Sequence, residues 1–133
     1  MFKWFIAYGA SAAAFLVLDS IWLSYAIPKL YRPGFGPLLA DNFRLVPALI
    51  FYLIYIAGIV LLAVKPAEQA HSVVTAATLG GALGLVCYAT YYMTNLSTLR
   101  GWPDNLAIVD LAWGTVATST TTVVSYLAML WIT

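Results

Sequence analysis

Two aspartates stand inside long apolar runs of this sequence, and each is followed by a tryptophan three residues later. The pairs are Asp19 with Trp22 and Asp110 with Trp113. A spacing of three places each tryptophan on the same helix face as its aspartate. A charged aspartate at the centre of a membrane helix costs about 2.5–3.5 kcal/mol on insertion scales, so it normally faces the bundle interior and finds partners. Two nearby carboxylates cannot both be ionised cheaply, which favours binding of a proton or another cation.

Another apolar run ends in a polar face that would join these carboxylates. Tyr88, Tyr91 or Tyr92, and Asn95 follow a spacing of three to four, and Arg100 lies near the same end. We therefore predict one polar cavity toward this end of the chain's helices. The residues predicted to bind a ligand there are Asp19, Trp22, Tyr88, Tyr91, Tyr92, Asn95, Arg100, Asp110 and Trp113. The alternative is structural, with the aspartates bonded across a helix interface and the tyrosines packed or placed at the headgroups.

The elements that must position these residues are membrane-spanning helices. Of the 133 residues, 63% are hydrophobic and 8% are charged, whereas a soluble domain carries about a quarter charged residues. A spanning helix needs roughly 20 mostly apolar residues. We therefore predict an all-α fold, a single transmembrane domain over residues 1–133 with four helices in a compact bundle. The predicted spans are residues 4–27, 45–64, 72–94 and 105–131.

Short connectors separate these spans. Residues 28–37 hold three prolines and two glycines, which predicts that no continuous helix runs through them. Residues 65–71 form the second predicted connector. Tyr31, Phe35 and Phe43 are expected at headgroup level, where interfacial aromatic residues gather.

The distribution of basic residues predicts the orientation. Four spans put both chain ends on one side of the membrane, together with Lys3 and Lys65. The opposite side carries four basic residues, and the positive-inside rule places that side in the cytoplasm. These four are Lys29, Arg32, Arg44 and Arg100. Both termini are therefore predicted to be periplasmic.

Small residues spaced by four predict where helices pack closely. Such a spacing on one helix face lets two backbones approach each other in a membrane. The residues predicted to pack in this way are Ala76, Gly80, Gly84, Gly114, Thr118 and Thr122. These faces would close the bundle internally or form a homodimer.

Several kinds of site are not supported by the sequence. One histidine, His71, cannot supply a bis-histidine haem site. No metal-ligand spacing and no nucleophile constellation is present, so we predict no metal site and no catalytic residue and specify no cofactor. Cys87 is expected to be a small buried hydrophobe. A net charge of +1 does not indicate a basic surface for binding nucleic acid.

Three segments resemble a known family. They are ATYYMTNLSTLRGWP at 89–103, VDLAWGT at 109–115 and LDSIWL at 18–23. Together they resemble the domain-of-unknown-function family 2177, small four-span bacterial membrane proteins of about this length. The resemblance implies a four-helix fold and a bacterial inner membrane, and it supplies no reaction. It also implies an acidic residue where this chain has Tyr92, which would reduce a family carboxylate cluster to Asp19 and Asp110 here.

Three functions follow as hypotheses. The first is binding or transport of a small polar ligand, a cation or a proton through Asp19 and Asp110. The second is an accessory role in a larger membrane complex, whose partners would be other subunits as well as membrane lipids. The third is a lipid-related enzyme that uses the carboxylates as acid and base. No nucleophile or metal motif supports the third, so a function without catalysis is favoured.

Overall fold

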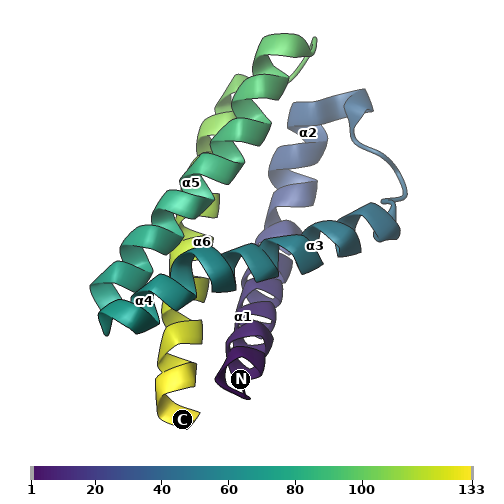
Figure 1. Cartoon of the computed structure of the whole chain (residues 1–133). Helices are drawn as coiled ribbons and strands as arrows, with labels where there is room; N and C mark the ends of the chain where they lie inside the picture. The colour runs from purple at the N-terminus through teal and green to yellow at the C-terminus, as the bar shows by residue number, and fades with distance from the viewer. Residues whose placement is uncertain (1, 133) are drawn as a thin grey trace.

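Helices account for most of the chain in the computed structural model, which describes residues 2–132 (Figure 1). Four helices within these residues are long and apolar enough to cross a membrane, and they pack against one another. They cover Phe2–Leu38, Leu45–Ala70, Val73–Thr98 and Asp104–Ile132. Both chain ends lie at the same end of the bundle (Figure 1). The predicted all-α, four-span fold is therefore confirmed.

The first two spans are composite helices, and the last two are regular. The first span consists of α1 (Phe2–Ala26), the π-helical segment η1 (Ile27–Tyr31), α2 (Arg32–Phe35) and the 3₁₀ turn η2 (Gly36–Leu38). The second consists of α3 (Leu45–Ile59), the π-helical segment η3 (Val60–Val64) and α4 (Lys65–Ala70). The third and fourth are α5 (Val73–Thr98) and α6 (Asp104–Ile132).

The prediction that residues 28–37 interrupt the first helix is wrong for residues 28–35, which continue it through η1 and α2, and is confirmed at Gly36, whose φ of 57° ends α2 before the 3₁₀ turn η2. A proline leaves the carbonyl four residues earlier without its N–H partner and crowds it. For Pro33 and Pro66 that carbonyl belongs to Lys29 and Leu62, and these two residues lie inside η1 and η3. In a π turn the carbonyl accepts a hydrogen bond from the N–H five residues later instead of four. Such local adjustments let membrane helices tolerate proline.

The second predicted connector is also largely helical, since α4 runs to Ala70. The chain then turns at His71, whose φ is 51°. Ser72 caps the next helix, because its side chain accepts the N–H of Thr75 at 3.0 Å. A similar tight turn at Gly101, with φ of 76°, joins α5 to α6. These short turns make α5 antiparallel to both of its chain neighbours.

Glycines let α5 and α6 approach until their backbones nearly touch. A Cβ atom on Gly84 would collide with the carbonyl of Gly114, and one on Gly80 would stand 2.9 Å from the carbonyl oxygen of Thr118. A Cβ on Gly114 would in turn collide with the ring of Tyr88. Small residues at these positions therefore hold α5 on α6 and leave room for the Tyr88 ring.

On its other side α6 packs antiparallel to α1. Ser125 donates a hydrogen bond of 2.8 Å to the carbonyl of Ala7. This register places the aspartate of each Asp-x-x-Trp motif opposite the tryptophan of the other. At the terminal end of the bundle, Lys3 pairs with Glu68 at 2.9 Å and joins α1 to α4.

The first half of α3 leans away from α5 (Figure 1). Its second half is packed, with Ile56 and Ile59 buried in the core. Near its middle, α3 holds to α1, where Tyr8 donates a hydrogen bond of 3.1 Å to the carbonyl of Leu53. Leu45 is 69% exposed although it is apolar. The four-helix bundle is therefore tight where α5 and α6 meet and loose at the start of α3.

Replacing Gly84 by Ala is expected to destabilise the bundle by about 1–3 kcal/mol, the usual cost of overpacking a well-packed core. The added methyl group meets the backbone of Gly114, which cannot rotate away as a side chain can. Gly58→Ala is the matched control, because nothing lies within 4 Å of the place its Cβ would take. Reversible unfolding in SDS-containing micelles, followed by circular dichroism, measures both. Equal stabilities of the two variants would contradict the close approach of α5 and α6.

Candidate functional site

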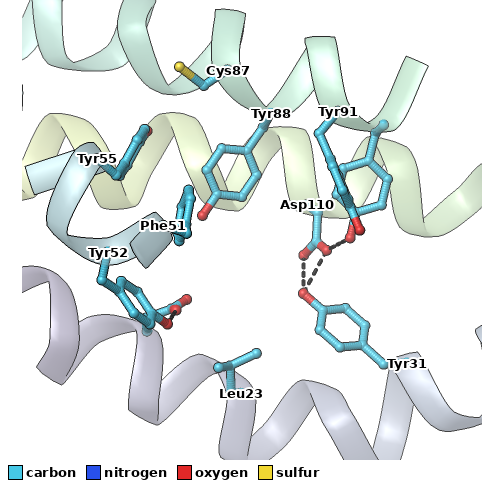
Figure 2. A pocket seen from close by; sticks show the side chains of 11 residues that line it. Leu23, Tyr31, Phe51, Tyr52, Tyr55, Cys87, Tyr88, Tyr91 and Asp110 are labelled. Atoms are coloured by element: carbon cyan, nitrogen blue, oxygen red, sulfur yellow. Dashed lines mark hydrogen bonds between the residues drawn. The ribbon is translucent and has the colours of Figure 1, made fainter. Parts of the chain in front are cut away.

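A cavity of about 480 Å³ lies between the helices and reaches Tyr31 of η1, and Figure 2 shows the side chains that line it. All four spans contribute to its wall. Seven of the side chains are aromatic and two are carboxylates. The wall consists of Asp19, Leu23, Tyr31, Phe51, Tyr52, Tyr55, Cys87, Tyr88, Tyr91, Tyr92 and Asp110.

Asp110 on α6 is 1% exposed and lies at the centre of a hydrogen-bond network. The hydroxyl of Tyr31 donates to both carboxylate oxygens, at 2.7 and 2.6 Å, and Tyr92 on α5 donates to one of them (Figure 2). The indole N–H of Trp22 donates to the Tyr31 oxygen at 2.9 Å. This network ties η1, α1 and α5 to a single carboxylate of α6.

Asp19 on α1 is the second buried carboxylate of the wall, at 9% exposure. It accepts a hydrogen bond from the hydroxyl of Tyr52, which joins it to α3. The indole nitrogen of Trp113 lies close to the same carboxylate without reaching hydrogen-bond geometry. Asp19 thus links α1 to α3 as Asp110 links α6 to α5 and η1.

The two tryptophans stack on each other between the carboxylates. The ring centroids of Trp22 and Trp113 are 4.9 Å apart and the ring planes differ by 11°. Trp22 also approaches Asp110, as Trp113 approaches Asp19. The two Asp-x-x-Trp motifs therefore meet as a local antiparallel pair in which each carboxylate has the other motif's indole beside it.

The cavity carries acidic groups without a basic side chain in its wall. The ion pair that the structure describes within residues 2–132 joins Lys3 to Glu68, near the terminal end of the bundle. Hydroxyl donors satisfy part of the acceptor capacity of Asp19 and Asp110. The site can therefore offer negative charge, aromatic ring faces and hydroxyl groups to a bound molecule.

The structure brings together most of the residues that the sequence predicted for this site. Asp19, Asp110 and the three tyrosines of α5 line the cavity. Trp22 and Trp113 lie directly beside the two carboxylates. Asn95 and Arg100 are not in the wall, and Arg100 is exposed at the end of α5.

Sequence reasoning missed the contribution of the second span and that of Tyr31 in the first. Tyr52 and Tyr55 are spaced by three on α3, a signal that would have placed both on one face. The hydroxyl of Tyr55 lies 2.8 Å from that of Thr118. Tyr31, expected at headgroup level, turns inward to Asp110. Cys87, expected to be buried, is half-buried in the cavity wall.

Tyr31 and Asp110 are expected to be coupled in their effect on stability. A double-mutant cycle of Tyr31→Phe and Asp110→Ala should give a coupling energy of about 0.6–1.7 kcal/mol, as for hydrogen bonds between membrane helices. Tyr8→Phe combined with Asp110→Ala is the control, because Tyr8 bonds Leu53 near the other end of α1 and its effect should add independently. SDS-induced unfolding supplies the free energies. No coupling in the first cycle would contradict the proposed strength of this contact.

Comparison with known proteins identifies the family of the chain. The sequence model of one family, DUF2177, matches residues 4–127, and its description is "predicted membrane protein". No curated protein and no solved structure matches the chain. The family description agrees with the four candidate spans. The match covers the three segments that carry the resemblance, so the chain belongs to the domain-of-unknown-function family 2177 of predicted membrane proteins.

Proposed function

We propose that this protein binds an organic cation inside the membrane, with the positively charged group held by Asp19 and Asp110. One observation carries the proposal: two buried carboxylates face a single aromatic-walled cavity that has no basic side chain in its wall. Binding needs only this conformation, whereas transport would need a second conformation of the same site.

The first support is electrostatic. Carboxylates taken out of water lose several kcal/mol of hydration each, and the hydrogen bonds from Tyr31, Tyr52 and Tyr92 return only part of it. Ionisable groups inside membrane proteins usually pair with one another or with a transported or bound charge. A monovalent cation between Asp19 and Asp110 would attract both groups and balance one of their two negative charges.

The second support is the chemistry of the walls. Aromatic faces attract alkylammonium groups, by about 0.5–2 kcal/mol for each ring, and aromatic cages recognise quaternary ammonium. Hard metal ions instead need about six or more oxygen ligands. The Tyr88 hydroxyl points into the cavity, and the rings of Phe51 and Tyr55 stack at 5.2 Å in its wall (Figure 2). A volume of about 480 Å³ is in the range of small-molecule sites.

We also propose that the cavity end of the bundle faces the cytoplasm of a bacterial cell. The cavity end holds four basic residues, whereas the terminal end holds Lys3 and Lys65, and Lys3 is paired with Glu68. The positive-inside rule favours this arrangement.

A reporter fused to the C-terminus tests the orientation. Alkaline phosphatase folds actively only in the periplasm, so this fusion is expected to be active and a C-terminal green fluorescent protein dark. A bright fluorescent fusion with an inactive phosphatase would reverse the proposed orientation.

Choline should bind to the purified protein at least tenfold more tightly than 3,3-dimethylbutan-1-ol, its neutral isostere, because only choline carries the positive charge. Asp19→Asn is expected to weaken choline binding by about tenfold or more, which corresponds to about 1.4 kcal/mol. Isothermal titration calorimetry measures both ligands on the same preparation.

Asp104→Asn is the matched control, because Asp104 is an exposed acid at the start of α6 and lies outside the cavity wall. It should leave choline binding unchanged. Equal binding of the two isosteres, or equal effects of the two substitutions, would refute cation recognition. Recovery of the protein only in a stoichiometric complex with other subunits would instead favour the accessory role.

A further inference from the structure

We infer that the bound cation is the head of a long-chain amphiphile that reaches the cavity from within the bilayer. The inference rests on the proposed function and adds the source and class of the ligand. A long-chain amine or quaternary ammonium would place its head at Asp19 and Asp110 and leave its tail among the lipids.

The opening of the cavity is defined by two exposed aromatic side chains. Phe51 on α3 is 46% exposed and Tyr91 on α5 is 54% exposed, and both line the cavity. The other side chains of the wall are buried or half-buried. The cavity therefore opens sideways between α3 and α5, where α3 leans away from the bundle (Figure 1).

The depth of this rim places it among acyl chains. The two spans that carry the rim have 26 residues each, so each is about 39 Å long against a hydrocarbon core of about 30 Å. An upright helix of this length would project about 4–5 Å beyond the hydrocarbon at each end, and a tilted helix such as α3 projects less. Phe51 follows Leu45, the start of its span, by six residues, and Tyr91 precedes Thr98 by seven, which places them about 9 and 10.5 Å along the helix axis from the helix ends. The opening thus faces the hydrocarbon of the membrane.

An apolar surface continues outward from the rim. Ile54, one turn along α3 from Phe51 and on the same face, is 68% exposed, and Pro47, one turn before Phe51, is exposed as well. An acyl chain that leaves the cavity past Phe51 meets apolar side chains on one side and lipid on the other. A tail of any length can be accommodated there, because the cavity does not have to enclose it.

The charge of the wall selects among bilayer amphiphiles. A zwitterionic phospholipid would bring its phosphate close to Asp19 and Asp110, where no basic side chain of the wall would neutralise it. Like charges at close range in a low dielectric repel strongly. A purely cationic head meets only attraction, so the ligand class is a cationic amphiphile.

Binding of three matched probes to the protein in nanodiscs of a neutral glycolipid tests the inference. The probes are choline, hexadecyltrimethylammonium and hexadecylphosphocholine. Asp19→Asn nanodiscs measured in parallel subtract the partition of each probe into lipid. We expect Asp19-dependent binding of hexadecyltrimethylammonium at least tenfold tighter than that of choline and at least tenfold tighter than that of hexadecylphosphocholine.

The three probes separate the bilayer source of the ligand, its cationic class and the proposed function itself. Choline that binds as tightly as hexadecyltrimethylammonium, or more tightly, would overturn the bilayer source and leave the proposed function standing. Hexadecylphosphocholine that binds as tightly as the cation would overturn the cationic class. If no probe shows Asp19-dependent binding, the proposed function itself fails.

A photoreactive long-chain amine, with a diazirine in the middle of its tail, locates the opening directly. Cross-links are expected on peptides around Phe51 and Tyr91, and excess hexadecyltrimethylammonium should suppress them at least fivefold. Ile132, exposed near the other end of α6, serves as the reference for random contact from lipid. Competable cross-links confined to other positions would refute a lateral opening between α3 and α5.

Discussion

The hydrogen bonds that tyrosines donate to two buried carboxylates organise this bundle. A carboxylate inside a membrane must find donors or carry its full desolvation penalty. Asp110 finds them in Tyr31 and Tyr92, and Asp19 finds one in Tyr52. These three tyrosines come from three different spans, so satisfying the carboxylates also fixes how the spans meet. The same bonds that lower the cost of burying charge therefore build the walls of the cavity.

The spans and the central pair of motifs could be predicted from the sequence because they depend on local regularity. Apolar runs of sufficient length specify helices, and a spacing of three keeps Trp22 with Asp19 on one face. The tyrosines of α5 follow the same rule. Their meeting with the aspartates in one cavity was predicted because this polar face lies toward one end of its helix and would join the carboxylates there.

Tyr31 could not be predicted because the local geometry departs from a regular helix. Nine residues separate it from Trp22, which on an α-helix amounts to a rotation of about 180° from the same face. The π-helical segment η1 turns less per residue, and it ends at Tyr31, whose hydroxyl reaches both Trp22 and Asp110. The prolines that looked like helix breakers, Pro28 and Pro33, are associated with this segment. Proline and π turn together place an interfacial tyrosine inside the bundle.

The two walls of the cavity differ in how tightly they are packed. α5 and α6 meet backbone to backbone at Gly84 and Gly114, so the wall that carries Tyr88, Tyr92 and Asp110 is rigid. The opposite wall belongs to α3, whose first half is exposed and whose hydrogen bonds with α1 lie near its middle, at Tyr52 and Leu53. A wall of this kind can adjust to a ligand at small cost, because little buried surface is lost when it moves. The lateral opening between α3 and α5 thus has one rigid side and one adaptable side.

The two carboxylates are unequal for the same reason. Ionised, a carboxylate offers about four acceptor sites. Asp110 shares its oxygens between two tyrosines and lies on the rigid wall, whereas Asp19 accepts from Tyr52 on the adaptable one. Asp19 therefore keeps more capacity for a ligand, and its donor can shift with α3 when a cation arrives. Asp110 supplies its charge to the site while its hydrogen bonds hold the bundle together. Of the two Asp-x-x-Trp motifs, the one with Asp110 therefore mainly stabilises the bundle, and the one with Asp19 mainly binds the ligand.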